Sequence, residues 1–135
     1  PAISGNGEKL AFIVNRNGRP TVQLQDIRDG KMFTLRYLSR HQPHSSPSLS
    51  WNGRYLAVIT QRGSQRLPII EDRVTGRMHQ ISLPRERVPV RLSLAPDASQ
   101  IAVQVAYKGQ WRVEIFDLTN MIDLDQISVS RIDIP

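Results

Sequence analysis

The chain has 135 residues and a formal net charge of +6, with 39% hydrophobic residues and no cysteine. This composition is typical of a folded protein, and the lack of cysteine excludes disulfides and thiolate chemistry. No apolar run approaches the roughly 20 residues of a membrane-spanning helix, and no signal peptide is visible, so either none existed or it has been removed. The positive charge favours acidic partners or anionic surfaces.

The start of the chain contains three short apolar or β-branched runs, which are predicted to be strands. The first covers residues 10–15 (LAFIVN) and the second covers 21–27 (TVQLQDI), with a polar loop at Gly18 between them. Two such runs joined by a few polar residues are typical of a β-hairpin. A turn around Gly30 then leads into a third run at 31–37.

The same order of elements returns twice. Residues 55–60 and 67–73 form the next predicted hairpin, and a further run follows at 78–83. Residues 101–106 and 111–118 form the third hairpin. A short stretch before each opening turn supplies one more strand, so each unit is expected to have four. No segment carries a long apolar stripe of helical period, so little helix is expected.

Equivalent residues recur at a constant offset, which identifies these elements as copies of one unit. Gly53 follows Gly7 by 46 residues, and Asp72 follows Asp26 by the same number. Asp117 follows Asp72 by 45 residues. A period of about 40–50 residues indicates an array, and four antiparallel strands in about 45 residues form one propeller blade. A β-sandwich would not need the same turn three times. The predicted fold is therefore all-β, one domain over residues 1–135 with three four-stranded antiparallel blades at about 1–46, 47–90 and 91–135.

Three blades leave two blade faces without a neighbour, since closed propellers have roughly four to eight blades. A homodimer that pairs two arcs into a six-bladed ring would cover both faces, and two-fold dimers are the commonest oligomers. Packing onto a larger assembly is a second solution, and a chain that is part of a longer protein is a third. The tail at residues 126–135 alternates apolar and polar residues and is expected to be the last strand of the third blade or a clasp onto the first.

Two expectations concern packing. Pro68 lies inside a predicted strand and cannot donate a ladder hydrogen bond, so we expect a local irregularity or a shifted strand there. Equivalent apolar positions in the three repeats should be buried between blades, namely Phe12, Val58 and Val103, with Leu10, Leu56 and Ile101 beside them.

The opening turn and the strand that follows it resemble the TolB-type (PD40) propeller repeat. The second unit, "LSWNGRYLAV … IIEDRVTGR", carries the resemblance best, and "ISGNGEKLAF … LQDIRDGK" and "LAPDASQIAV … IFDLTN" are looser copies. The usual Ser-Pro-Asp-Gly turn of that family is altered in every copy. The resemblance implies a periplasmic or otherwise extracytoplasmic protein that binds other proteins and is not an enzyme; a cytoplasmic location is the alternative.

No catalytic constellation, cofactor motif or metal cluster is apparent. His41 and His44 have His-x-x-His spacing, but the loop offers no cysteine or adjacent carboxylate to complete a closed site, and His79 lies elsewhere. The recurring Asp26, Asp72 and Asp117 are expected to accept backbone hydrogen bonds where a strand ends. We therefore expect no catalytic, cofactor or metal site.

The cations are unevenly placed. In a four-stranded blade the loops of the central hairpin and the links between blades emerge on one face, and the opposite face mixes both signs of charge. Arginine is enriched at protein interfaces and holds carboxylates with two hydrogen bonds. This face is therefore either a set of solvated loop arginines or a site that docks an acidic protein or a larger complex. Its candidate residues are Arg16, Arg19, Arg40, Arg62, Arg66, Arg85, Arg87, Lys108 and Trp111.

Nucleic acids and small molecules are two other kinds of candidate ligand. Nucleic acid is disfavoured because aromatic residues are only 6% of the chain and no groove-reading helix is predicted. A small-molecule or hydrolytic site in the propeller channel is the alternative function, because ligands often occupy concave sites. Trp51, in the second opening turn, is expected to pack against a neighbouring blade rather than to bind a ligand.

Overall fold

The computed structural model describes residues 1–35, 37–38 and 43–125, and within these ranges it has eleven strands and no α-helix. The first sheet holds β1 (Ala2–Ile3), β2 (Lys9–Arg16), β3 (Arg19–Asp26) and β4 (Met32–Phe33). The second holds β5 (His44–Leu49), β6 (Tyr55–Arg62), β7 (Gln65–Asp72) and β8 (Met78–Gln80). The third holds β9 (Val88–Leu94), β10 (Gln100–Tyr107) and β11 (Gln110–Asp117).

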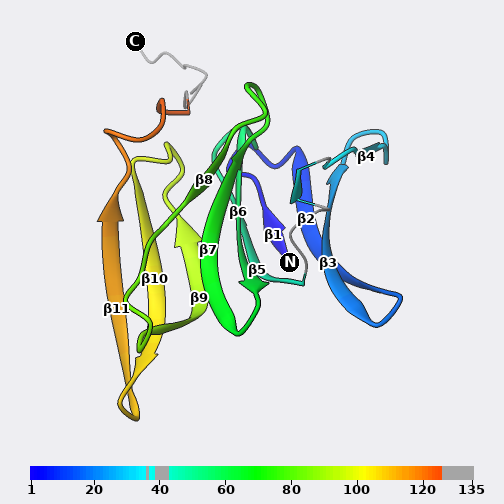
Figure 1. Ribbon diagram of the computed structural model, residues 1–135. Helices are drawn as coiled ribbons and strands as arrows, with labels where there is room; N and C mark the ends of the chain where they lie inside the picture. The colour runs from blue at the N-terminus through cyan, green and yellow to red at the C-terminus, as the bar shows by residue number, and fades with distance from the viewer. Residues whose placement is uncertain (36, 39–42, 126–135) are drawn as a thin grey trace.

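Every strand pair is antiparallel, and each sheet follows chain order, so the predicted all-β propeller architecture is confirmed. The three sheets, here called blades 1 to 3, stand side by side in an open arc (Figure 1). The fourth strand of blade 3 was expected in the tail at 126–135, which lies outside the described residues. None of the described segments forms a helix long and apolar enough to cross a membrane.

Tight turns close the long hairpins. In blade 1 the register pairs Arg16 with Arg19, so Asn17 and Gly18 form a two-residue turn with positive φ at both positions, 54° and 80°. Blade 3 repeats this geometry at Lys108, whose φ is 49°, and Gly109. Positive φ at both central residues matches the right-handed twist of the strands, so these turns keep the hairpins in register.

The opening turn of each blade is closed by the residue five positions before the start of the second strand. In blade 2 the backbone N–H of Gly53 donates to the Ser50 carbonyl at 3.0 Å, and the N–H of Tyr55 donates to the Ser50 hydroxyl at 3.0 Å. Ser4 plays the same part in blade 1. The Trp51 ring lies against Gly5 of the blade 1 turn, where a Cβ would collide with it, so its predicted packing against a neighbouring blade is confirmed.

Apolar side chains fill the two spaces between the blades. We call the face of a blade that looks toward the preceding blade its leading flank, and the opposite face its trailing flank. In blade 2, Leu56 and Val58 lie on the leading flank, and Ala57 and Ile70 on the trailing flank; all four are fully buried. Each interblade core is therefore one trailing flank packed on one leading flank.

The predicted core positions are confirmed in blades 2 and 3, where Leu56, Val58, Ile101 and Val103 are fully buried. In blade 1 the equivalent Leu10 and Phe12 are only half-buried, so this part of the prediction is wrong. The reason is position in the array, because Leu10 and Phe12 belong to a leading flank against which the described residues place no other blade.

Two strand predictions also need correction. The predicted irregularity at Pro68 is absent, since β6 and β7 stay in regular register with Ile59 opposite Pro68. The Pro68 carbonyl accepts from Ile81 N–H at 3.0 Å, just beyond the end of β8, so the missing N–H lies where the ladder ends. The run predicted at 31–37 forms strand only at β4, because Leu35 and Leu38 leave it to enter the core between blades 1 and 2.

Candidate docking face

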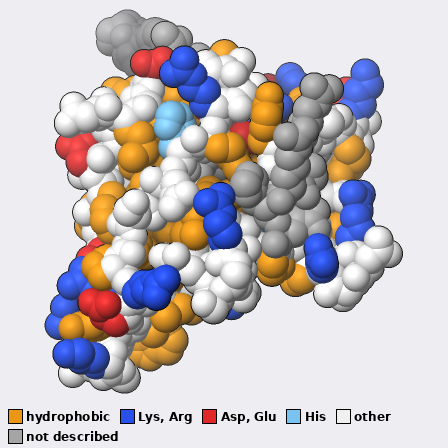
Figure 2. Space-filling model, viewed as in Figure 1, with side chains coloured by type: hydrophobic (Ala, Val, Ile, Leu, Met, Phe, Trp, Pro, Cys, Tyr) orange, Lys and Arg blue, Asp and Glu red, His pale blue; other side chains and the backbone are white. Residues whose placement is uncertain are grey.

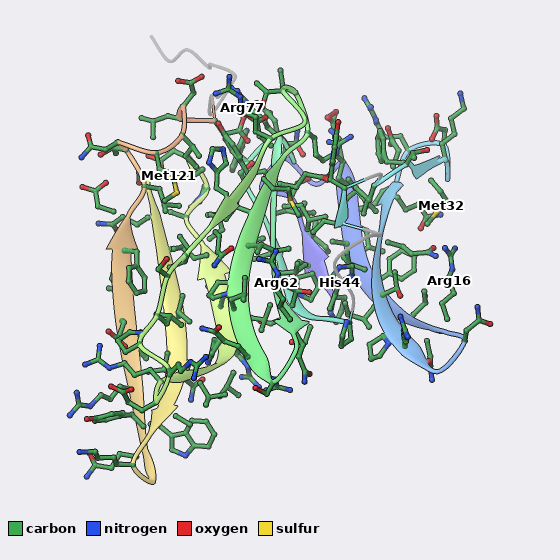
Figure 3. All side chains as sticks on the ribbon, in the orientation of Figure 1. Arg16, Met32, His44, Arg62, Arg77 and Met121 are labelled. Atoms are coloured by element: carbon green, nitrogen blue, oxygen red, sulfur yellow. The ribbon has the colours of Figure 1, made fainter. Side chains whose placement is uncertain are left out.

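The turns of the three long hairpins lie at one end of the arc, with the link between β8 and β9 (Figure 1). Figure 2 shows Lys and Arg side chains at this end and also at the opposite end. We call the cations at the end with the hairpin turns the basic rim. Arg87 is half-buried, and the other rim side chains are exposed. Its described members are Arg16, Arg19, Arg62, Arg66, Arg85, Arg87 and Lys108. In Figure 3 Arg16 and Arg62 lie on this side of the molecule and Arg77 lies at the opposite end.

The rim has two parts. Arg66, Arg85 and Arg87 line one shallow hollow, because the β8–β9 link passes beside the β6–β7 hairpin. Arg16 and Arg19 lie on the separate hairpin of blade 1, at the other side of the arc. The predicted Arg40 lies outside the described residues. Trp111 does not join the rim, since its side chain stands on the trailing flank of blade 3.

Arg87 differs from the rest of the rim because it has a carboxylate partner. Its Nη1 lies 2.8 Å from Glu114 Oε2, and its guanidinium lies 5.4 Å from the centre of the Tyr107 ring. Lys108 and Arg112 approach the same ring at 5.2 and 5.1 Å. The sequence analysis did not identify Glu114. Because Glu114 directly precedes Ile115 on β11, strand alternation places the two side chains on opposite faces of the sheet.

The other rim cations have no carboxylate within 4.0 Å in the described part of the chain. The opposite end is different. There Arg28 contacts Glu8 at 3.0 Å and Asp26 at 2.9 Å, and Arg54 contacts Asp72 at 3.0 Å. Arg28 and Arg54 are thus compensated by intramolecular pairs, although Lys31 and Arg77 at the same end are not, whereas every described rim cation except Arg87 lacks such a pair.

The recurring aspartates do what the sequence predicts of them. The carboxylates of Asp26, Asp72 and Asp117 accept backbone N–H groups two residues later at 2.9, 3.0 and 2.9 Å. The side-chain and backbone hydrogen bonds of Arg28 lower the pKa of Asp26 to about 2. Burial raises the pKa of Asp72, but hydrogen bonds from Arg54 and its own turn outweigh burial and hold that pKa below its usual value. These carboxylates are structural clamps at strand ends.

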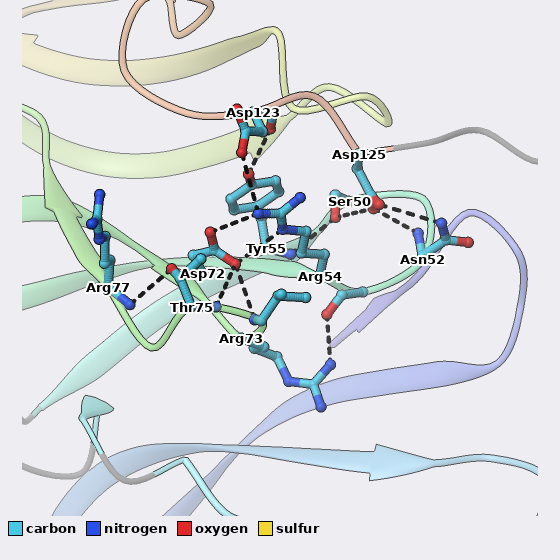
Figure 4. A network of polar contacts seen from close by, with 12 residues as sticks. Ser50, Asn52, Arg54, Tyr55, Asp72, Arg73, Thr75, Arg77, Asp123 and Asp125 are labelled. Carbon is cyan, nitrogen blue, oxygen red and sulfur yellow. Dashed lines mark hydrogen bonds and ion pairs between the residues drawn. The ribbon is translucent and has the colours of Figure 1, made fainter.

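The segment after β11 returns across the opening turns of blades 2 and 3, which the repeat pattern did not reveal (Figure 4). Asp125 is buried, and its Oδ2 accepts from the Ser50 hydroxyl at 2.5 Å and from Asn52 N–H at 2.8 Å. The Tyr55 hydroxyl donates to the Asp123 carbonyl at 2.5 Å. We call residues 119–125 the return segment. It ties the end of blade 3 to the turn of blade 2.

His44 joins blades 1 and 2 and is not placed to hold a metal. Its Nδ1 accepts the backbone N–H of Val22 at 3.0 Å, which fixes Nε2 as the protonated nitrogen. Nε2 then donates to the Leu38 carbonyl at 2.8 Å. Both ring nitrogens are therefore engaged. His41 lies outside the described residues, and within those residues no three acidic or histidine side chains cluster as metal ligands would.

Glu71 is a buried carboxylate between blades 1 and 2. Burial raises its pKa, while backbone N–H groups of Leu38 and Tyr37 and the charge of Arg73 oppose that rise. One of its oxygens, Oε1, is buried and has no hydrogen-bond partner in the described part of the chain. The charged form of Glu71 is thus penalised in the folded protein.

Replacement Glu71→Gln is expected to stabilise the protein more at pH 8 than at pH 4, relative to the unchanged chain. The raised pKa means that the folded state favours the protonated acid, so the native chain loses stability as the pH rises through that pKa. Glutamine keeps an acceptor for the two backbone N–H groups and cannot ionise. Urea unfolding across this pH range measures the difference, and a difference that does not change with pH would contradict the expectation. Glu86→Gln, on the exposed link, is the control and should change the free energy of unfolding by less than about 0.5 kcal/mol.

A further hollow lies at the end opposite the rim, between the β7–β8 turn and the return segment. Its lining is polar and includes Asp72, His79 and Asp123. Asp72 is already held by Arg54 and by its own turn, and the Asp123 side chain is largely exposed. Asp72 therefore has a structural role in this hollow.

Comparison with known proteins agrees with this fold. A scan against protein-family models finds no match. A curated TolB homologue from Chlorobium luteolum is 26% identical over 120 residues, which is 87% of this chain and 26% of that protein. The chain thus spans about a quarter of the length of this curated relative.

Solved structures that share the fold are β-propellers. A TolB structure from Agrobacterium tumefaciens superposes with a TM-score of 0.71 at 14% identity, over 87% of this chain and 44% of that one. The β-propeller domain of the Trilobed protease from Pyrococcus furiosus superposes with a TM-score of 0.68 at 14% identity, over 93% of this chain and 40% of that one. The chain is a short, open TolB-like β-propeller array, and its neighbours include both TolB proteins and propeller domains of proteases.

Proposed function

We propose that the chain is a non-enzymatic protein-binding module whose basic rim docks an acidic surface of a protein partner or of a larger complex. The observation that carries this proposal is the uneven compensation of charge. At the opposite end Arg28 and Arg54 are neutralised within the chain, whereas Arg62, Arg66 and Arg85 have no intramolecular carboxylate in the described part of the chain. Carboxylates of a protein partner would provide the negative charge that these arginines do not find within the chain.

The kinship with TolB supports a protein as the partner, and the resemblance of the repeats implies a periplasmic or other extracytoplasmic location. The likeness to protease propellers also fits this role, because those propellers are domains of larger proteins. The polar hollow at the end opposite the rim contains Asp72, which is held by Arg54 and by its own turn, and this favours binding over a hydrolytic or small-molecule site in the channel.

An acidic protein surface fits the rim better than a nucleic acid. Single-stranded nucleic acids stack their bases on exposed aromatic rings. Tyr107 is the aromatic residue of the third hairpin turn, and its ring is approached by Arg87, Lys108 and Arg112. Those cations surround the Tyr107 ring, and the exposed ring of Trp111 lies on the trailing flank, so within the described residues the rim itself is charged and not aromatic.

Reversing two rim charges tests the proposal. The double replacement Arg62→Glu with Arg66→Glu is expected to weaken binding of a polyglutamate peptide about tenfold or more at low salt and to reduce the salt dependence of binding. Folding should stay nearly intact, since exposed substitutions usually change the free energy of unfolding by less than about 0.5 kcal/mol. Isothermal titration at several salt concentrations measures both effects.

The matched control is Lys31→Glu with Arg77→Glu at the other end, which changes the net charge by the same amount. It should weaken peptide binding much less. If the two reversals weaken binding equally, only net charge attracts the peptide and the rim is not a docking site. A single-stranded DNA of equal charge that binds the unchanged chain more tightly than the peptide would also contradict the proposal.

A further inference from the structure

The trailing flank of blade 3 exposes a row of large apolar side chains. Trp111, Val113 and Ile115 alternate along β11, so all three project from the same face of the sheet, and they are 65%, 66% and 65% exposed. Their cross-strand neighbours on β10 are Ala106, Gln104 and Ala102, so two alanines extend the apolar surface on either side of one glutamine. A large exposed apolar patch on a folded protein marks a site of association.

The repeat shows what covers this surface in the other blades. Ile115 is equivalent to Ile70 of blade 2 and to Leu24 of blade 1, and both of those are fully buried. Ala102 is equivalent to Ala57 and Ala11, which are also fully buried. In blades 1 and 2 each of these positions is covered by the leading flank of the next blade. The trailing flank of blade 3 therefore has apolar residues at the positions that, in blades 1 and 2, contact the leading flank of the next blade.

The arc has one leading flank to offer, at its other end. On blade 1, Ile3 and Met32 are 62% and 47% exposed, and Leu10 and Phe12 are half-buried. Ile3 pairs with Leu10 in the sheet, so the two share this face. The equivalents Leu56 and Val58 in blade 2 are buried against blade 1. The two ends of the arc thus repeat the two halves of the blade 1–blade 2 contact.

We propose that the trailing flank of blade 3, with Trp111, Val113 and Ile115, binds the leading flank of blade 1 in a second copy of this chain. A two-fold axis along the axis of the arc then forms the same contact twice and covers both open flanks. The second copy is the occupant because it carries the matching half of a contact that the fold already makes between its own blades. This surface is separate from the basic rim and uses apolar burial in place of charge.

Solution mass tests the pairing. The chain of 15.3 kDa should sediment at about twice that mass at micromolar concentration. The replacements Val113→Asp with Ile115→Asp should weaken self-association roughly thirty-fold or more, as charge at the centre of an apolar contact does. Ile3→Asp with Met32→Asp, on the opposite flank, should weaken it similarly. Val74→Asp, an exposed apolar residue on the β7–β8 turn, is the control and should change nothing.

Mixing the two double variants distinguishes this pairing, in which unlike flanks meet, from one in which two blade 3 flanks or two blade 1 flanks meet. Each variant alone has no intact contact with its own kind, but a mixed pair keeps one contact between an intact blade 3 flank and an intact blade 1 flank. Sedimentation should therefore show a mixed dimer that forms more readily than either homodimer. A chain that stays monomeric up to about 100 µM overturns the proposal. So does a blade 1 variant that dimerises like the unchanged chain, because blade 3 flanks would then pair with each other.

Salt separates this contact from the rim. Raising the salt concentration should leave self-association unchanged or strengthen it, because both copies are positive and their repulsion is screened. Binding of an acidic peptide to the rim should weaken under the same conditions. Self-association that falls with salt in parallel with peptide binding would overturn the flank contact.

Discussion

Truncation of Ile70 to alanine is expected to lower the free energy of unfolding by about 2–4 kcal/mol, whereas the same truncation at Ile115 should cost less than about 0.5 kcal/mol. The two residues occupy the same position of the repeat and the same face of their blades. Ile70 is fully buried against blade 3, and Ile115 is 65% exposed. The difference in cost therefore comes from the neighbouring blade alone and not from the local strand.

Urea unfolding of the two variants measures this difference. The protein concentration must be low enough to keep the chain monomeric, since a second copy on the flank would bury Ile115 and raise the cost of removing it. Equal costs for the two truncations in the monomer would mean that the assigned register is wrong. A cost at Ile115 that appears only at high concentration would support the flank contact as well.

The sequence predicts most of the fold because the fold is repeated. One strand pattern alone is ambiguous, but the return of Asp26 as Asp72 and Asp117 fixes the period, and the period predicts the blade. The same repetition predicts the clamp at each strand end, where all three carboxylates accept a backbone N–H. Features shared by all copies are visible in the sequence for this reason.

Features that depend on position in the array are not visible in the same way. Phe12 and Val58 are equivalent in sequence, yet Val58 is buried and Phe12 is half-exposed, because a residue is buried by its neighbour and the described residues place no blade before the first. The error at Pro68 has a related cause. A proline destabilises a sheet only where another residue at that position would donate a backbone hydrogen bond to the neighbouring strand. Whether Pro68 lies at such a position depends on where β8 ends.

The rim illustrates what loop positions alone can and cannot predict. Hairpin turns at equivalent positions place their arginines at one end of the arc, which the repeat predicts. The pairing of Arg87 with Glu114 depends on how the β8–β9 link lies relative to β11. The repeat period does not predict this arrangement. The position of Trp111 just after a hairpin turn predicts a rim residue, but strand alternation places its side chain on the flank.

The repeat pattern does not predict the return segment. We expect Asp125, which holds this segment in place, to stabilise the folded state as much as a core residue does. Asp125→Ala should lower the free energy of unfolding by about 2–4 kcal/mol. The buried carboxylate accepts the Ser50 hydroxyl and the Asn52 N–H, and its own backbone N–H donates to the Asp97 carbonyl. Alanine removes the carboxylate that accepts from the buried Ser50 hydroxyl and from the part-buried Asn52 N–H. The desolvation cost of the buried hydroxyl adds to the lost charge-assisted hydrogen bonds.

Asp123→Ala is the matched control two residues away. Its side chain is 86% exposed and lies 3.7 Å from Arg54, while the Tyr55 hydroxyl uses only the backbone carbonyl, which alanine retains. It should cost less than about 0.5 kcal/mol. Chemical unfolding compares the two variants, and equal stabilities would show that the return segment is not docked as described. Both variants should bind the acidic peptide like the unchanged chain, because the segment lies at the end opposite the rim. If Asp125→Ala abolished peptide binding in a chain that remains folded, the acidic partner would have to bind at the opening turns of the blades and not at the hairpin turns of the rim.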